Sequence, residues 1–282
     1  MLRAMKSQRC PTTVILVLAF AAPLTGCSRF APPGQQSSRH VATLTAECDQ
    51  GKYVSCFSLG TKFASGDGVA KDNSRAVALY QRACEGGNAQ GCGGLGFMYE
   101  TGSGLAQDTA RAATLYRRAC DSGDGLGCAF LGTMYEAGKR MAKDEASAVT
   151  LYQRACDSGN AMGCDQLGRM YYHGKGLATD EARAVALYQK SCDGGYAPGC
   201  ADLGATYGLG SGVPKDGGRA ATLFQRACDG DDAEACATLG EVYEAGEGAK
   251  DRARALALYQ KACQMGIKKS CNDATRLAKP LT

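Results

Sequence analysis

The sequence has no tryptophan and only two histidines, His40 and His173, among its 282 residues. Zinc enzymes hold their metal with several histidines or carboxylates, and the motif His-Glu-x-x-His is absent. The serine β-lactamase motifs Ser-x-x-Lys, Lys-Thr-Gly and Ser-Asp-Asn are also absent, as is the Gly-Lys-Ser/Thr of a phosphate-binding loop. We therefore expect no catalytic centre, cofactor site or metal site of these kinds.

The sequence also lacks a basic block. Three of the 32 basic residues, Arg3, Lys6 and Arg9, precede residue 27, where no acidic residue occurs. The rest of the chain holds 29 basic and 28 acidic residues. Because nucleic-acid-binding domains carry clustered basic patches, we expect no nucleic-acid partner.

The longest apolar run, Val14 to Ala22, follows those three basic residues. This arrangement is typical of an export signal, and the run is too short to span a bilayer as a mature helix. Leu24-Thr25-Gly26-Cys27 then resembles the bacterial lipobox. The resemblance implies cleavage before Cys27 and lipidation of that residue. Ordinary secretion, with cleavage near Ala21, is the alternative.

Cysteine counting favours the lipobox. Cys10 would leave with the signal, and lipidation of Cys27 would leave 14 cysteines in seven pairs. Cleavage near Ala21 would leave Cys27 as an odd thiol in an oxidising compartment. We therefore divide the chain into a signal peptide (1–26), a lipidated cysteine with a flexible tether and a short helix ending at Cys48 (27–47), a repeat region (48–271), and a C-terminal helix end and tail (272–282).

A unit of about 36 residues recurs through the chain. In one unit, Leu95, Gly96 and Tyr99 lie at helical spacing, Gly102 is placed to end that helix, and Asp108 is placed to cap the next. Each unit therefore predicts a helix–turn–helix pair. Stacked pairs bury the faces that a lone pair would expose, so the sequence predicts an all-α superhelical solenoid of about six repeats.

Two residue series recur in the units, and we assign both to structure because a catalytic residue is needed only once. The aspartates are predicted helix N-caps: Asp72, Asp108, Asp144, Asp180, Asp216 and Asp251. The aromatics that follow Leu-Gly are predicted core residues: Phe63, Tyr99, Tyr135, Tyr171, Tyr207 and Tyr243.

These motifs resemble the Sel-1-like repeat family, which is related to the tetratricopeptide repeat. The pattern Leu-Gly-x-x-Tyr-x-x-Gly-x-Gly-x-x-x-Asp-x-x-Arg-Ala-x-x-Leu-Tyr-x-x-Ala-Cys runs through residues 48–271, and the paired cysteines resemble the Helicobacter cysteine-rich protein branch. The resemblance implies a right-handed α/α superhelix with one disulfide per repeat. It also implies two candidate functions, which are protein or peptide binding and penicillin binding with slow β-lactam hydrolysis.

The cysteines of each unit are eight residues apart, across a predicted corner between two helices. Sequence alone does not fix disulfide connectivity, but seven identical spacings favour local pairing. The predicted disulfides are Cys48–Cys56, Cys84–Cys92, Cys120–Cys128, Cys156–Cys164, Cys192–Cys200, Cys228–Cys236 and Cys263–Cys271. Zinc binding and redox catalysis are the alternatives, and both favour Cys-x-x-Cys spacing instead.

Function is expected where the repeats differ. In related superhelices the first helix of each pair lines the concave face. Aromatic residues, Met and Arg are the residue types enriched at binding interfaces. The predicted groove residues are Phe97, Met98, Met134, Arg169, Met170 and Tyr172. The alternative is that these side chains are partly buried between neighbouring helices.

We predict a non-catalytic scaffold that is anchored by its N-terminal lipid to a bacterial membrane, on the periplasmic face or in the outer membrane, with secretion as the second choice. Its partner is expected to be an envelope protein or peptide. The alternative function is a penicillin-binding protein with weak β-lactamase activity, whose ligand would be a β-lactam or a cell-wall fragment.

Overall fold

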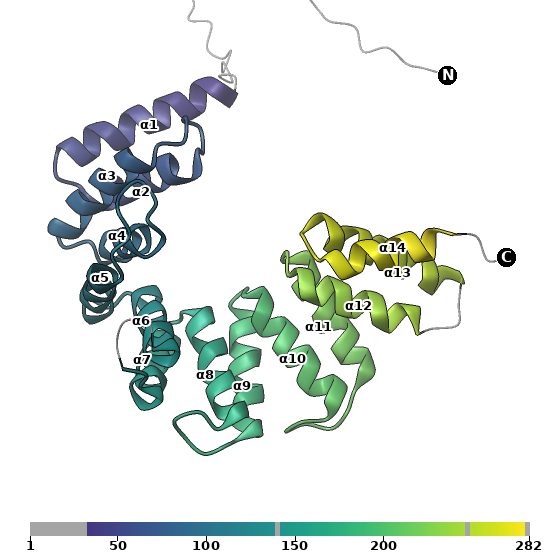
Figure 1. Ribbon diagram of the computed structural model, residues 1–282. Helices are drawn as coiled ribbons and strands as arrows, with labels where there is room; N and C mark the ends of the chain where they lie inside the picture. Colours follow the sequence, from purple (N-terminus) through teal and green to yellow (C-terminus); the bar gives the residue numbers. More distant parts are fainter. Residues whose placement is uncertain (1–32, 139–141, 246–248, 280–282) are drawn as a thin grey trace, which may run out of the picture.

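The computed structural model describes residues 33–138, 142–245 and 249–279, so the predicted signal peptide and Cys27 lie outside the described residues. All regular structure in the described part is helical, and the helices stack in chain order along an arc (Figure 1). The predicted all-α solenoid is confirmed. The helices are α1 (Pro33–Asp49), α2 (Tyr53–Ser65), α3 (Asn73–Glu85), α4 (Ala89–Thr101), α5 (Thr109–Asp121), α6 (Gly125–Ala137), α7 (Glu145–Asp157), α8 (Ala161–His173), α9 (Glu181–Asp193), α10 (Ala197–Leu209), α11 (Gly217–Asp229), α12 (Ala233–Glu244), α13 (Ala249–Gln264) and α14 (Lys268–Ala278).

Most helix ends follow the predicted chemistry. The Asp108 carboxylate accepts a hydrogen bond from the Arg111 backbone N–H at 3.0 Å and caps α5. At the end of α4, Gly102 has a φ of 70°, a left-handed conformation that glycine adopts without steric cost. The same aspartate cap occurs at Asp72, Asp144, Asp180 and Asp216. The cap prediction for Asp251 is wrong, because this residue lies inside the first turn of α13.

In each helix pair a glycine lies directly against a buried ring. A Cβ on Gly96 would lie 2.9 Å from the Tyr116 ring, and one on Gly132 would lie 2.7 Å from the Tyr152 ring. Glycine is needed here because any side chain would occupy the space of the ring. The same contact recurs at Gly60–Tyr80, Gly168–Tyr188, Gly204–Phe224 and Gly240–Tyr259.

The aromatics that follow Leu-Gly pack against the core clusters as predicted, but they are only half-buried. The Arg111 guanidinium lies 5.6 Å from the centroid of the Tyr99 ring, within the range of a cation–π interaction. Equivalent stacking joins Arg75–Phe63, Arg183–Tyr171, Arg219–Tyr207 and Arg254–Tyr243. The fully buried aromatic series is instead the one that packs on the Leu-Gly glycines.

Seven disulfides link the end of each odd-numbered helix to the start of the next helix. In α3 and α4, for example, the Cα atoms of Cys84 and Cys92 are 4.5 Å apart. The pairs are Cys48–Cys56, Cys84–Cys92, Cys120–Cys128, Cys156–Cys164, Cys192–Cys200, Cys228–Cys236 and Cys263–Cys271, one at each such corner. On the chain-entropy model, a loop this short adds roughly 2–3 kcal/mol of stability.

Basic side chains join consecutive repeats beside these disulfides. The Arg118 guanidinium donates a hydrogen bond to the backbone carbonyl of Cys84 at 2.8 Å, in the preceding pair. Carbonyls at helix C-termini have no intrahelical partner, and a cation also complements the helix dipole there. The equivalent bonds are Arg154–Cys120, Lys190–Cys156, Arg226–Cys192 and Lys261–Cys228.

The two ends of the array differ in how well they were predicted. A flexible tether followed by a short helix was expected within residues 27–47, but α1 extends over Pro33–Asp49, so the helix takes up most of that segment. Leu44 and Cys48, one helical turn apart, are buried, and α1 packs on α2. At the other end, α14 agrees with the predicted helix at residues 268–279.

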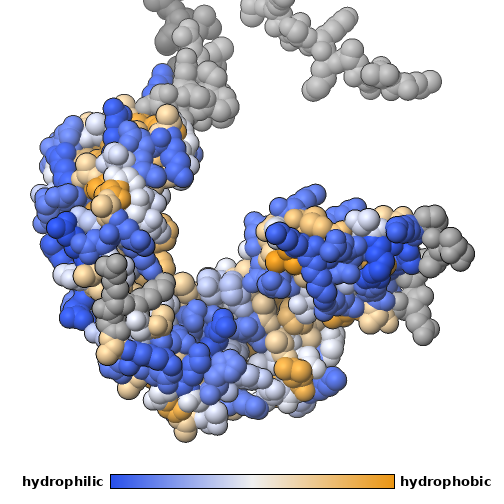
Figure 2. Space-filling view, viewed as in Figure 1, coloured by the Kyte–Doolittle hydropathy of each residue, from blue (hydrophilic) through white to orange (hydrophobic). Residues whose placement is uncertain are grey.

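The even-numbered helices form the inner side of the arc. Contacts join α2 to α4, α4 to α6, α6 to α8, and α8 to α10, as expected where stacked helices lie on the shorter radius. The space-filling view shows a mainly hydrophilic molecule that curves around a hollow (Figure 2). This arrangement agrees with the expectation that the first helix of each pair lines the concave face.

We expect the variant Gly132→Ala to unfold more easily than the wild type. Its Cβ would meet the Tyr152 ring at 2.7 Å, and overpacking of this kind costs about 1–3 kcal/mol. The control is Gly217→Ala at the start of α11, where an added Cβ meets nothing within 4 Å. Guanidinium unfolding monitored by circular dichroism should separate the two variants, and equal midpoints would contradict the ring-contact argument.

Candidate binding surface on the inner face

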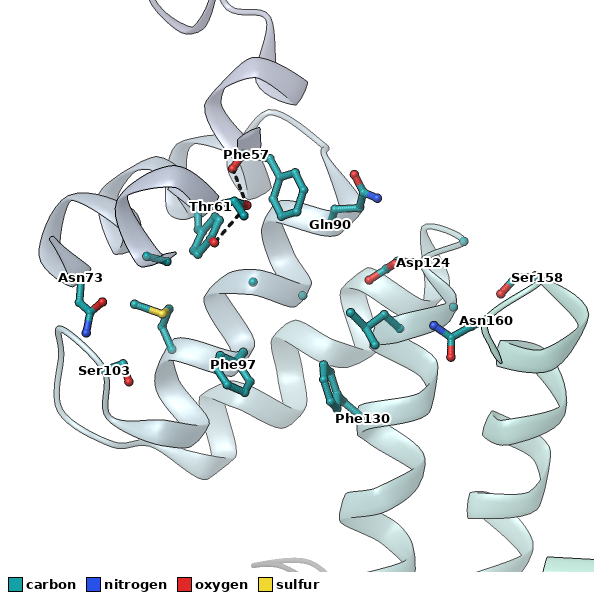
Figure 3. A pocket seen from close by; sticks show the side chains of 18 of the residues that line it. Phe57, Thr61, Asn73, Gln90, Phe97, Ser103, Asp124, Phe130, Ser158 and Asn160 are labelled. Atoms are coloured by element: carbon teal, nitrogen blue, oxygen red, sulfur yellow. Dashed lines mark hydrogen bonds between the residues drawn. The ribbon is translucent and has the colours of Figure 1, made fainter. Parts of the chain in front are cut away.

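A groove of about 800 Å³ lies on the inner face at the N-terminal half of the array. Phe57 from α2, Phe97 from α4 and Phe130 from α6 contribute its aromatic surface (Figure 3). The full lining is Phe57, Thr61, Ala64, Lys71, Asn73, Tyr80, Gln90, Gly93, Gly94, Phe97, Met98, Ser103, Gly123, Asp124, Gly125, Leu126, Phe130, Ser158, Gly159 and Asn160. We call this surface the N-terminal groove.

In the N-terminal groove, α4 carries two consecutive glycines, Gly93 and Gly94, directly after its cysteine. The equivalent positions hold Phe57 and Ser58 in α2, and Ala129 and Phe130 in α6. The middle helix therefore contributes no side chain there, and the Asp124 carboxylate and the Tyr80 ring approach its backbone, with an added Cβ 2.9 Å from Asp124 at Gly93 and 3.3 Å from Tyr80 at Gly94.

Apolar side chains in the N-terminal groove are open to solvent. Phe97 is 47% exposed, and its ring lies 6.3 Å from the ring of Phe130. Phe130 also packs against the buried Tyr116, at 5.2 Å between ring centroids. Leu126 is exposed nearby. Because the core holds the rings in place, this aromatic surface is preformed.

The sides of the N-terminal groove are polar but carry little charge. Asn73 and Ser103 lie on one side, and Ser158 and Asn160 lie on the other (Figure 3). The charged side chains of the lining are one lysine and one aspartate. Amide and hydroxyl groups of this kind can pair with the backbone N–H and C=O groups of an extended chain.

The structure separates the predicted groove residues. Phe97 and Met98 line the N-terminal groove, although Met98 is buried at its base. Met134 and Met170 are in the core, so their prediction as groove contacts is wrong. The physical reason is spacing, since each methionine lies three residues after the buried leucine of Leu-Gly and shares its helix face.

The other two predicted groove residues, Arg169 and Tyr172, line a different pocket. It has a volume of about 250 Å³ and lies between α8 and α10, against Tyr188 of α9. We call it the α8–α10 pocket, and its lining is Arg169, Tyr172, His173, Tyr188, Asp202, Ala205, Thr206 and Leu209. The predicted single groove is therefore two separate sites.

An unpaired carboxylate lies beside the α8–α10 pocket. Asp165 is 0% exposed, and neither of its oxygens has a hydrogen-bond partner in the described part of the chain. The pKa of Asp165 is raised from 3.8 to about 7, mainly by burial and secondarily by the charge of Asp202, while Arg169 opposes the shift. Burial also raises the pKa of Asp202. Sequence reasoning missed Asp165, although the equivalent residue is alanine in α6, α10 and α12.

The buried tyrosines show a second local difference. The hydroxyls of Tyr116, Tyr152 and Tyr259 each donate to a glutamate of the preceding helix at 2.9 Å (Glu100, Glu136 and Glu244). In the fourth pair, Tyr172 stands in the place of that glutamate. The Tyr188 hydroxyl has no hydrogen-bond partner among the described residues, and Tyr188 lines the α8–α10 pocket.

Comparison with known proteins agrees with this architecture. Six consecutive segments match the Sel1 repeat, at residues 54–88, 89–124, 125–160, 161–196, 197–232 and 233–267. The chain belongs to the Sel1 repeat family. Sel1 repeats form scaffolds for protein–protein interaction, so an interaction surface is expected on this one. The disulfides of this Sel1 repeat chain are typical of an oxidising, exported compartment.

Three solved structures illustrate the likeness. The c5321 protein, a protective antigen of uropathogenic Escherichia coli strains, is 28% identical with a TM-score of 0.64, over 86% of this chain and 55% of that one. This chain therefore spans about half the length of c5321. A Sel1 repeat protein from Oxalobacter formigenes is 24% identical with a TM-score of 0.66, over 88% and 94% of the two chains. Helicobacter pylori cysteine rich protein B is 33% identical with a TM-score of 0.40, over 47% of this chain and 96% of that one.

A comparison with curated proteins gives no match. In the described part of this Sel1 repeat chain, no helix combines the length and apolarity needed to cross a membrane.

We expect Asp165→Ala to stabilise the protein at pH 8 and to change it little at pH 4. Because folding raises the pKa of this carboxyl from 3.8 to about 7, the unfolded chain releases the proton first as pH rises. Stability is therefore lost between pH 4 and pH 7, and the whole penalty is present above pH 7. Removing the carboxyl should recover on the order of 2–4 kcal/mol at pH 8.

Unfolding midpoints at pH 4, 6 and 8 would measure this dependence. Asp193→Ala is the matched control, because its carboxylate is exposed and pairs with Arg226 only at the surface, at 3.4 Å. A destabilisation by Asp165→Ala that is equal at all three pH values would show that Asp165 is not a buried, strained acid.

Proposed function

We propose that this chain is an exported, lipid-anchored Sel1 repeat scaffold that binds a protein or peptide partner in the N-terminal groove. The observation that carries the proposal is the preformed groove itself, in which Phe97, Phe130 and Leu126 are accessible beside a base of two glycines. Aromatic side chains that are already fixed by the core lose little freedom on binding, which favours affinity.

The chemistry of the N-terminal groove suits an extended segment with a bulky apolar side chain. That side chain would lie against the exposed faces of Phe97 and Leu126. The polar groups at the sides, including Asn73 and Asn160, would pair with the backbone of the segment. A nearly neutral rim favours recognition by shape and hydrogen bonding over recognition by net charge.

The anchor is supported by the sequence. The lipobox-like Leu24-Thr25-Gly26-Cys27 follows an export signal, and all 14 cysteines after Cys27 are used in the seven disulfides. Cys27 is then the one cysteine beyond the signal that is left for acylation. No finding supports the β-lactam-binding alternative, and it is not part of the proposal.

We expect a photoreactive residue at position 97 to crosslink one discrete partner in intact cells. The matched control is the same probe at position 242, because Val242 is 46% exposed and also lies on an even-numbered helix. Binding of the identified partner by the purified chain should then weaken roughly tenfold or more in Phe97→Ala, as for a hot-spot aromatic. Val242→Ala should bind like the wild type.

Calorimetry measures that affinity, and circular dichroism confirms that each variant is folded. Identical crosslinked species from positions 97 and 242, or an unchanged affinity for Phe97→Ala, would remove the N-terminal groove as the binding site.

We expect Cys27→Ser to release the protein from the membrane fraction while the disulfides remain intact. Stable anchoring needs more than one acyl chain, and the modified cysteine would carry them. Intact-mass spectrometry of the wild-type protein should show a chain that begins at Cys27 with added acyl mass. A wild-type chain that begins near residue 22 without acyl mass would replace the anchor with ordinary secretion.

A further inference from the structure

The region around the α8–α10 pocket holds more carboxylates than guanidinium groups. Arg169 and Asp202 face each other across the pocket with 3.9 Å between Nε and Oδ2, and both side chains are partly exposed. Asp165 and Asp232 lie close enough to interact with this pair, since Asp232 raises the pKa of both Asp165 and Asp202, and Asp202 raises that of Asp165. One guanidinium therefore has three carboxylates in its neighbourhood, of which Asp202 lines the pocket, and an added cation would improve the balance.

Two polar groups in this region have no hydrogen-bond partner within the described part of the chain, and one of them, Asp165, is buried. Asp165 is 0% exposed and accepts no hydrogen bond within the described part of the chain. The second group is the Tyr188 hydroxyl, which is unpaired among the described residues but is not buried, since Tyr188 lines the pocket. Leaving a buried polar group unsatisfied costs about 1–3 kcal/mol, and more for a charged group. Polar groups in this state are suited to a ligand that completes their hydrogen bonds.

The other repeats show that neither feature is required by the fold. The position of Asp165 is occupied by Ala129, Ala201 and Ala237 in α6, α10 and α12. The fifth pair avoids the unpaired hydroxyl, because it places Phe224 where the other pairs have tyrosine. The fourth pair has therefore replaced an internal partner with Tyr172 and has gained a buried acid beside the same pocket.

We propose that the α8–α10 pocket binds the primary ammonium or guanidinium group of a lysine or arginine side chain from a bound peptide. The cation would lie against the Asp202 carboxylate and the Tyr188 hydroxyl, with the charge of Asp165 behind them. The Tyr172 ring supplies a face for cation–π attraction, and Ala205 and Leu209 supply apolar surface for the aliphatic stem. The proposal rests on the proposed function only for the source of the side chain, since the chemistry belongs to the pocket itself.

The test is an NMR titration of the isotope-labelled full chain with Nα-acetyl-lysine methylamide. The neutral comparison is the norleucine analogue, which has the same stem without the ammonium group. We expect the lysine probe to shift amide signals of α8 and α10 in a saturable manner, and the norleucine probe to leave them unchanged. Equal shifts with both probes, or no shift with the lysine probe, would overturn the proposal.

Two variants locate the cation. Asp202→Asn keeps the shape of the side chain and removes its charge, and Asp165→Ala restores the residue of the other repeats. Each should weaken the lysine probe roughly fivefold to tenfold, as expected for loss of one charged partner. The control Asp193→Asn removes an exposed carboxylate on the same repeat and should bind like the wild type. Unchanged affinity in both pocket variants would place the probe elsewhere.

Two further arms identify the ligand class. If Ca²⁺ saturates the pocket and the lysine probe does not bind, the proposal is overturned in favour of a metal site. If butylammonium saturates the pocket and the lysine probe does not bind, it is overturned in favour of a site for a free amine. The variant Phe97→Ala separates this pocket from the N-terminal groove. If the lysine probe still binds that variant while the crosslinked partner does not, the two sites act independently. If the partner binds the wild type but the lysine probe does not, this inference fails and the proposed function stands.

Discussion

The structure depends on one steric constraint, which is the contact between the Leu-Gly glycine and the ring of the following helix. Because the glycine at Gly132 or Gly168 has no side chain, an aromatic ring can lie on the helix backbone and become fully buried. This contact sets the distance between the two helices of each pair. The stacking of pairs, the position of the disulfides and the inner face of even-numbered helices all follow from pairs of constant shape.

The same contact creates a chemical requirement that the repeats meet differently. A buried tyrosine brings a hydroxyl into the interior. In three pairs this hydroxyl donates a hydrogen bond to a glutamate, as Tyr152 does to Glu136. Phe224 has no hydroxyl and needs no partner. The Tyr188 hydroxyl has no partner in the described part of the chain, and Asp165 in the same pair is also unpaired. A residue that differs from its equivalents in the other repeats is therefore a good candidate for a functional role, because the fold does not require it. Both candidate sites lie where a repeat departs from the others.

Much of the fold could be predicted from sequence because its determinants are local. The Asp108 cap and the Cys84–Cys92 bridge depend on residues a few positions apart. The buried position of Met134 could also have been predicted, since it lies one helical turn after Leu131. The N-terminal groove could not, because it arises from rings on three separate helices. Which rings converge depends on the curvature of the array, and small rotations per repeat set that curvature.

The seven disulfides all lie on one edge of the array, at the corners that lead into even-numbered helices and into α14. The opposite edge holds the loops that lead from even-numbered to odd-numbered helices, such as residues 102–108, and none of these is bridged. Insertions and deletions in these loops do not change the size of any loop that a disulfide closes. They also leave the spacing of the cysteines at each bridged corner unchanged. The single unit that is one residue shorter than the others differs in this kind of loop, between α12 and α13. The bridged edge of the array therefore tolerates little change in loop length. The loops of the opposite edge can change in sequence and length without altering how the disulfides form.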